Sequence, residues 1–125
     1  MKIKFIFMDK MQFGRLGEDI ACNFLINKGY IVILRNFYTK FGEIDIICSK
    51  SNELFFVEVK TRSNSILRNY PENAVSYKKQ QSMSRAAEIY LKRKRIYNTM
   101  YSFSVVAIIL NLRTRKAGIK FFEKI

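Results

Sequence analysis

Asp45, Glu58 and Lys60 have the residue types and the spacing that phosphodiester hydrolysis requires. Glu58 and Lys60 lie two positions apart in an apolar run, and side chains alternate between the two faces of a strand. We therefore expect both to point to one face. Asp45 lies in the preceding apolar run, where alternation places Ile44 and Ile46 together on the opposite face. If the two runs pair as a hairpin, Asp45 and Glu58 converge.

Two carboxylates inside apolar strands need a positive partner, because burying one carboxylate alone costs several kcal/mol and a second makes ionisation harder. Mg²⁺ or Mn²⁺ would serve, since hard cations take oxygen ligands and are often held by one or two carboxylates plus phosphate oxygens. The metal would polarise a phosphoryl oxygen and activate water, and Lys60 would position that water or stabilise charge on the phosphate. Glu18, in the first helix, would add an outer or third carboxylate.

The same residues fit a second interpretation. Glu58 and Lys60 can be solvent-facing residues of a half-exposed strand, and Glu18 an ordinary surface residue of a helix. An E-x-K spacing by itself does not decide between the two interpretations, because it occurs in many proteins by chance.

The absence of histidine narrows the chemistry further. It excludes Ser-His and Cys-His catalysis and histidine general bases. Cys22 and Cys48 lie in apolar stretches, where reduced cysteine behaves as a small buried hydrophobe, and two cysteines without histidine do not make a structural zinc site. Catalysis here must rely on carboxylates, lysine or metal.

The charge balance points to a polyanionic partner. The 125 residues include 23 Lys and Arg against 10 Asp and Glu, a formal net charge of +13. Such a surface attracts nucleic acid and makes binding salt-dependent. We expect sequence-independent binding along one basic face, with Tyr38, Phe41 and Tyr70 in loops available to stack on unpaired bases. The residues expected to contact nucleic acid are Arg62, Lys78, Lys79, Gln80 and Arg85.

No stretch of about 18 uninterrupted apolar residues occurs, and the opening segment lacks a signal-peptide cleavage site. We therefore expect a soluble, cytoplasmic protein without a membrane partner. A membrane- or ribosome-associated basic protein is a further alternative, which only the net charge supports.

The elements around these residues predict a single α/β domain over residues 1–125, with 1–12 peripheral, and a mixed central sheet flanked by helices. The polar composition of 62–72 predicts a mobile loop. The expected order is α-β-β-β-α-β-β: helix Phe13–Lys28, strands Tyr30–Phe37, Glu43–Cys48 and Leu54–Thr61, a helix from 73 or 77 to 95, and strands Phe103–Leu110 and Gly118–Phe122.

Several motifs occur in a fixed order: G-R-L-G-E-D-I-A from Gly14, R-N-F from Arg35, G-E-I-D-I-I from Gly42 and F-V-E-V-K-T-R from Phe56. Together they closely resemble the YraN-like family, small bacterial proteins related to Holliday junction resolvases within the PD-(D/E)xK nuclease superfamily. The resemblance covers about residues 13–110 and implies a restriction-endonuclease-like core.

The resemblance also implies roles for individual residues. Asp45 would be the motif's Asp, with Glu58 and Lys60 as its E-x-K and Glu18 as the additional helical carboxylate. Metal would be held by Asp45, Glu58 and the backbone carbonyl of Val59. Lys79 and Gln80 match the second-helix K-Q of the family. Where the family usually has R-F-D-V-V, this chain has Ser102 and Ser104 in place of the Arg and the Asp.

The leading hypothesis is therefore a metal-dependent endonuclease acting on nucleic acid, DNA in preference to RNA, with branched DNA as a candidate substrate. The alternative is a non-catalytic nucleic-acid-binding module with a nuclease-like fold. A branched substrate cut symmetrically would call for a homodimer, since closed two-fold pairs are the commonest assembly.

Overall fold

The computed structural model describes residues 9–63, 75–111 and 113–125. Its elements follow the predicted order α-β-β-β-α-β-β, and the α/β fold class with a mixed sheet is confirmed. The elements are α1 (Lys10–Asn27), β1 (Ile31–Thr39), β2 (Gly42–Lys50), β3 (Glu53–Ser63), α2 (Tyr77–Arg93), β4 (Met100–Asn111) and β5 (Lys116–Phe122).

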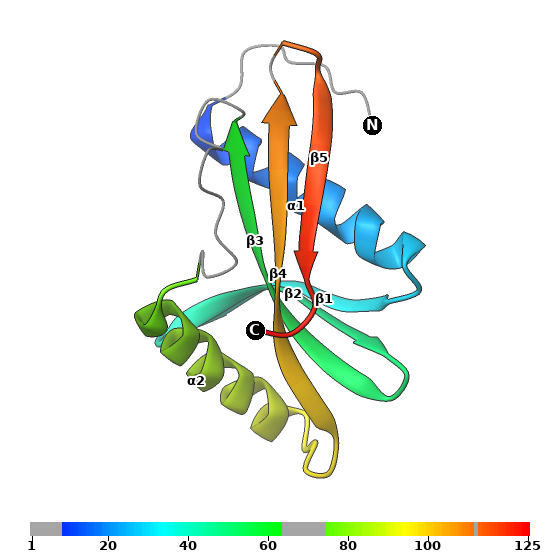
Figure 1. Ribbon diagram of the computed structural model, residues 1–125. Coiled ribbons are helices and arrows are strands. Elements are labelled where there is room, and N and C mark those ends of the chain that lie inside the picture. The colour runs from blue at the N-terminus through cyan, green and yellow to red at the C-terminus, as the bar shows by residue number, and fades with distance from the viewer. Residues whose placement is uncertain (1–8, 64–74, 112) are drawn as a thin grey trace.

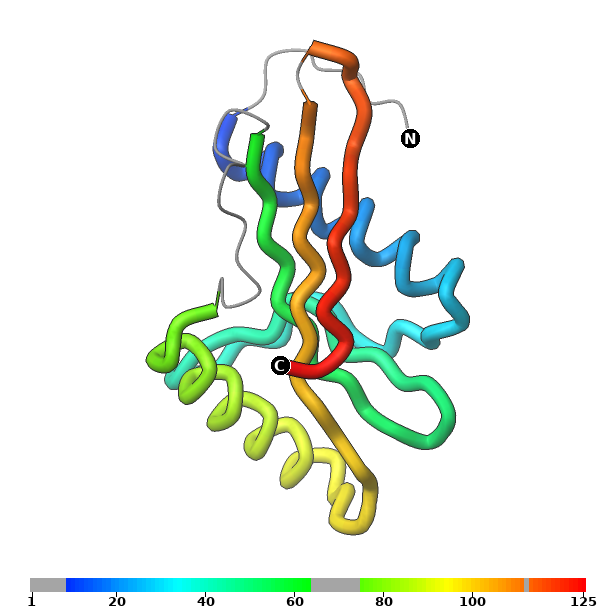
Figure 2. Tube along the Cα trace, viewed as in Figure 1, coloured from blue at the N-terminus to red at the C-terminus, as the bar shows by residue number. Residues whose placement is uncertain are grey.

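One five-stranded sheet, in the order β1-β2-β3-β4-β5, forms the centre of the molecule (Figure 1). Strands β3 and β4 are parallel, and every other neighbouring pair is antiparallel. The parallel pair follows from the chain path, because parallel neighbours need a crossover connection and α2 lies between β3 and β4. Figure 2 shows β4 running between β3 and β5, as the continuous apolar run Phe103–Leu110 predicts for a central strand.

The two helices cover opposite faces of the sheet. On one face Ile20, Ala21 and Leu25 of α1 pack on the sheet residues Ile46, Cys48, Phe55, Val57, Val106 and Ile108. On the other face Met83, Ala86, Ala87 and Tyr90 of α2 pack on Ile44, Ile47, Leu54, Phe56 and Val105. The sheet is therefore buried on both sides, which explains why its central strands are nearly continuous apolar runs.

Helix α1 begins three residues before the predicted Phe13. Asp9 caps it: the Asp9 side chain accepts a hydrogen bond from the Gln12 backbone N–H at 2.8 Å, and the Gln12 side chain accepts one from the Asp9 backbone N–H at 3.0 Å. This reciprocal capping box extends the helix beyond its apolar periodicity. Of the segment 1–12 expected to be peripheral, residues 10–12 belong to this helix and 1–8 lie outside the described residues.

Helix α1 approaches β3 very closely at Gly17. A Cβ built on Gly17 would lie 1.8 Å from Thr61 Oγ1 and 2.9 Å from Thr61 Cβ. Only a residue without a side chain allows the helix and the strand to come this near. This contact brings Glu18, the next residue, against the part of β3 that carries Glu58 and Val59.

The prediction that a loop begins at residue 62 is wrong for the first two residues. Arg62 and Ser63 are the last residues of β3, where they pair with Ile109 and Leu110 of β4. The rest of the expected loop, with Arg68 and Tyr70, lies outside the described residues. Helix α2 starts at Tyr77, one of the two predicted positions, and ends at Arg93, two residues before the predicted end.

Strand β2 departs from regular alternation at Asp45, and the prediction that Ile44 and Ile46 share a face is wrong. Ile44 packs with α2, whereas Ile46 packs with α1. The β2–β3 ladder has its last pair at Ile46 and Val57. On the other side β1 is distorted at Asn36, whose φ of 56° is left-handed. The sheet is thus irregular next to Asp45 both toward β3 and toward β1.

In the part of the chain that the structure describes, neither helix is long and apolar enough to cross a bilayer.

Candidate functional site

Asp45 and the backbone of β3 form the centre of the site. Asp45 Oδ2 accepts a hydrogen bond from the Val59 backbone N–H at 2.7 Å, and only 7% of Asp45 is exposed. This bond forms just beyond the last ladder pair of β2 and β3, so the Asp45 side chain takes the place of a backbone carbonyl of β2 as the acceptor. The carboxylate is fixed at the point where the two strands separate.

Glu58 lies beside Asp45 on the α2 side of the sheet, because its neighbours Val57 and Val59 both pack toward α1. It is 6% exposed. Lys79 Nζ lies 3.1 Å from Glu58 Oε2. The geometry of this contact does not satisfy a hydrogen bond, so among the described residues this buried oxygen has an ion-pair partner but no hydrogen-bond donor. A buried carboxylate oxygen in that situation is under-satisfied.

The proximity of Glu58 changes the acid–base behaviour of Asp45. Burial, together with the neighbouring charge of Glu58, raises the pKa of Asp45 from its ordinary 3.8 to about 7. The Val59 N–H and the Lys79 ammonium act in the opposite direction without cancelling this effect. Ionised Asp45 at neutral pH is therefore short of compensating positive charge.

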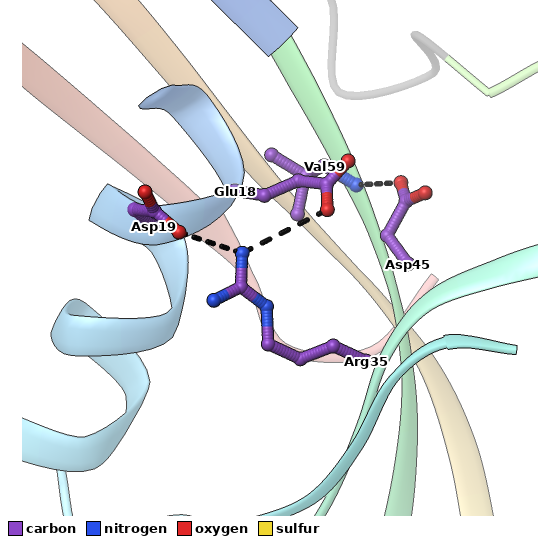
Figure 3. A network of polar contacts seen from close by, with 5 residues as sticks. All are labelled: Glu18, Asp19, Arg35, Asp45 and Val59. Carbon is purple, nitrogen blue, oxygen red and sulfur yellow. Dashed lines mark hydrogen bonds and ion pairs between the residues drawn. The ribbon is translucent and has the colours of Figure 1, made fainter. Parts of the chain in front are cut away.

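Glu18 approaches from α1 on the other side of Val59 (Figure 3). Arg35 Nη2 donates a hydrogen bond to Asp19 Oδ1 at 2.8 Å and lies 3.9 Å from Glu18 Oε1. Burial raises the pKa of Glu18, and the charge of Asp45 raises it further, whereas a hydrogen bond from Asn36 lowers it. Glu18 is thus electrostatically coupled to Asp45 and held by two residues of β1.

The donor set fits a hard divalent cation. Asp45 and Glu58 supply oxygen atoms, and Glu58 Oε2 has no hydrogen-bond donor among the described residues. A strand residue directs its N–H and C=O toward the same neighbour, so the Val59 carbonyl faces the Asp45 side as its N–H does. Within the described ranges, three or more His, Cys, Asp or Glu side chains do not form a group that could hold a metal ion. A cation here would complete its coordination with water or phosphate oxygens, as Mg²⁺ commonly does.

Three other predicted site residues lie in β3 or in α2: Lys60, Arg62 and Gln80. Lys60 follows Glu58 by two residues in β3 and is half-buried. Gln80 Nε2 donates to the carbonyl of Val75, which lies just before α2, at 3.2 Å. Arg62 Nη1 donates to the Thr61 carbonyl at 2.9 Å.

Two predicted nucleic-acid contacts are exposed on α2. Lys78 and Arg85 lie seven residues apart, so they share one face of the helix. The Arg85 guanidinium lies 5.4 Å from the centre of the Phe41 ring, at the turn between β1 and β2. Phe41 is 43% exposed, and Tyr38, predicted to lie in a loop, is an exposed residue of β1.

Ser102 and Ser104 make hydrogen bonds away from Asp45 and Glu58. The Ser102 hydroxyl donates to Glu53 Oε2 at 2.9 Å, five residues along β3 from Glu58. The buried Ser104 hydroxyl donates to the Glu123 carbonyl. Both serines therefore connect β4 to neighbouring segments, and the Asp45–Glu58 pair forms without the Arg and Asp that the family resemblance led us to expect at these positions.

Comparison with known proteins places this chain in one protein family. Residues 17–108 match the family described as "Uncharacterised protein family UPF0102". The chain belongs to UPF0102. The matched segment contains Glu18, Asp45, Glu58, Lys60 and Lys79, and the predicted YraN-like resemblance is confirmed.

Individual UPF0102 proteins align with most of the chain. One from Caldicellulosiruptor saccharolyticus is 39% identical over 93% of this chain and 98% of its own length. One from Dictyoglomus turgidum is 43% identical over 83% of this chain and 87% of its own length. One from Clostridium botulinum is 39% identical over 88% and 89%, respectively.

Sequence reasoning assigned no role to Arg35 and Asn36, although both lie in the R-N-F motif. The structure shows that they contact α1 acids beside Asp45. An Arg-Asn pair inside an otherwise apolar strand was the available signal. Lys79 was expected on a nucleic-acid-binding face, and the structure places its ammonium on Glu58.

Proposed function

We propose that this UPF0102 protein is a metal-dependent endonuclease that hydrolyses phosphodiester bonds in nucleic acid, with branched DNA among its substrates. The observation that carries the proposal is the meeting of two buried carboxylates, Asp45 and Glu58, where β2 and β3 separate. Burial of such a pair is costly without a cation. A divalent cation bound between the two carboxylates would relieve this cost.

In this proposal Asp45, Glu58 and the Val59 carbonyl would hold Mg²⁺ or Mn²⁺. A bound divalent ion supplies a Lewis acid for the phosphoryl oxygen and lowers the pKa of its water. Lys60, on the same strand face as Glu58, donates to the attacking water or to a non-bridging phosphate oxygen, and so stabilises charge that grows in the transition state. Glu18 takes part through its charge at Asp45, and Arg35 positions Glu18.

The net charge of +13 supports a polyanionic substrate. A cluster of carboxylates would by itself repel phosphate, so the basic residues must outweigh them along the path of the substrate. Lys78 and Arg85, on one face of α2, are the residues proposed to contact the phosphate backbone. If the substrate is cut symmetrically on two strands, two copies of the chain would be required, and light scattering of the complex would detect them.

The decisive test is cleavage of labelled branched, duplex and single-stranded DNA by wild type and by Asp45→Asn, with Mn²⁺, Mg²⁺ or chelator. Asn has the shape of Asp without the negative charge, so the variant also controls for a contaminating nuclease. We expect cutting only with metal, and a loss of about a hundredfold or more in Asp45→Asn. Equal cutting by both proteins, or cutting in chelator, would contradict the proposal.

A second candidate is a nucleic-acid-binding module without turnover. The Lys79–Glu58 ion pair favours it, because the ammonium neutralises one carboxylate without metal. In that case Asp45→Asn should bind DNA as tightly as wild type or more tightly, since one phosphate-repelling charge is gone, and neither protein should cut. RNA and DNA ligands measured in parallel would identify the preferred nucleic acid.

A further inference from the structure

Lys79 contacts the carboxylate that the proposed metal would need. Its Nζ lies 3.1 Å from Glu58 Oε2, the buried oxygen that has no hydrogen-bond donor among the described residues. The Glu58 side chain is 8% exposed, whereas the Lys79 side chain is 29% exposed. The anion is therefore fixed inside the fold, and the cation reaches it from a partly exposed position.

The location of Lys79 on its helix is unfavourable for a cation. It is the third residue of α2, and its backbone N–H donates to the Ser76 hydroxyl that caps the helix. The first turn of a helix is the positive end of the helix dipole, which stabilises anions and disfavours lysine. Contact with Glu58 offsets this cost. The negative charge of Glu58 therefore explains why a lysine is favourable at this position of α2.

We infer that Lys79 is a displaceable counter-cation: it neutralises Glu58 in the metal-free protein and leaves that carboxylate when a divalent ion binds. The inference rests on the proposed function. A divalent ion on Glu58 Oε2 would repel the nearby ammonium at short range, and this repulsion opposes the Lys79 contact. Lys79 has a long side chain that already borders solvent, so it can withdraw without a change in the backbone.

Displacement has a consequence for substrate binding. A displaced Lys79 ammonium remains tethered beside the site, where a phosphate of nucleic acid is an available anion. The phosphate would then neutralise the Lys79 ammonium in place of Glu58. Metal and nucleic acid should therefore bind more tightly together than either does alone, by the reciprocity of linked equilibria.

The test is a calorimetric titration of Mn²⁺ into metal-free wild type, Lys79→Met, Lys79→Arg and Lys78→Met. Lys79→Met removes the competing ammonium and should bind Mn²⁺ about fivefold or more tightly than wild type. Lys79→Arg keeps a cation that forms stronger carboxylate contacts, so its affinity should be equal to or below that of wild type. Lys78→Met removes an exposed neighbouring charge and should change affinity by less than about twofold, because such charges are screened.

Thermal unfolding of the same four proteins with and without Mn²⁺ provides a check of folding and an independent readout. Metal should raise the Tm of Lys79→Met more than that of wild type, since the stabilisation grows with affinity. Should Lys79→Met not fold, the comparison of Lys79→Arg with wild type tests the same competition, and tighter Mn²⁺ binding by the Arg variant would overturn the inference.

The outcomes separate this inference from the proposed function. Mn²⁺ binding by wild type that is no weaker than binding by Lys79→Met overturns the inference and leaves the metal site standing. An equal gain in Lys78→Met also overturns it, because the effect would then be general electrostatics. If none of the four proteins binds Mn²⁺, both the proposed metal site and the role of Lys79 are wrong.

Discussion

Asp45 is a buried acid whose ionisation opposes folding in the metal-free protein. Its pKa is raised from 3.8 to about 7 by burial and by Glu58, so between these values the folded protein binds more protons than the unfolded chain. Under that condition the free energy of unfolding falls as pH rises. The proposed metal would reverse the situation, because it would bind the ionised carboxylate, and we expect Mn²⁺ affinity to increase with pH toward neutrality.

The prediction is that the metal-free protein loses stability between about pH 4 and pH 7, by a few kcal/mol at most. Urea unfolding in chelator at several pH values measures this loss. Asp45→Asn carries no titrating group at this position, so the difference between its curve and that of wild type isolates Asp45 from Glu18 and other acids. If the free energy of unfolding changes with pH equally in both proteins, the pKa of Asp45 is not raised by folding.

At the scale of elements, the position of α1 on β3 depends on Gly17. A glycine inside a helix normally costs about 0.5–1 kcal/mol relative to alanine. Here the added Cβ would overlap the Thr61 hydroxyl and crowd its Cβ, and relief requires movement of the helix. We predict that Gly17→Ala destabilises the fold by about 1–3 kcal/mol, as overpacking does. It should also impair the site, since Glu18 moves with the helix.

Gly14 provides a matched control for this prediction. It lies in the same helix one turn earlier, and a Cβ added there would meet no atom within 4 Å. Gly14→Ala should therefore stabilise the protein by about 0.5–1 kcal/mol. Chemical denaturation of both variants tests the argument. If both substitutions shift stability in the same direction, helix propensity and not the contact with Thr61 governs position 17.

The +13 charge of the whole molecule does not by itself show where nucleic acid binds. Binding to a phosphate backbone releases counterions, and the log–log salt dependence of affinity becomes shallower by about 0.9 for each duplex phosphate that is no longer neutralised. We predict that Lys78→Ala with Arg85→Ala lowers the slope by about this amount for each of the two side chains. Fluorescence anisotropy of labelled DNA over a range of salt measures the slope.

Strand β5 provides the control at equal net charge. Lys116 and Lys120 are exposed on this edge strand, at the opposite edge of the sheet from β1. Replacing both with alanine removes the same two charges, and the slope should change much less than in the α2 variant. If the two double variants behave alike, only the total charge matters and the α2 face is not a binding surface.

The sequence by itself determined the order of elements and the residue types of the site. Apolar periodicity marked α1, α2 and the strands, because burial on a helix or strand repeats at a fixed spacing. Alternation placed Glu58 and Lys60 on one face, opposite Val57 and Val59, and the structure packs both valines toward α1. Motif order also identified the family, which the comparisons confirmed.

Element boundaries were predicted less well for a local reason. The start of α1 depends on the capping box of Asp9 and Gln12, and periodicity alone does not reveal it. Arg62 and Ser63 look like loop residues, yet pairing with β4 keeps them in β3. Polar residues extend a strand when a neighbouring strand satisfies their backbone groups.

Only the tertiary structure decided which groups meet. Val59 N–H reaches Asp45 because the β2–β3 ladder ends at the Ile46–Val57 pair, and Lys79 reaches Glu58 because α2 packs across that face. The same irregularity separates Ile44 from Ile46. These contacts join residues that are far apart in the chain and lie on different elements, and local patterns carry no information about such distances. Spacing in the sequence identifies the candidate site residues, and tertiary packing determines which of them are in contact.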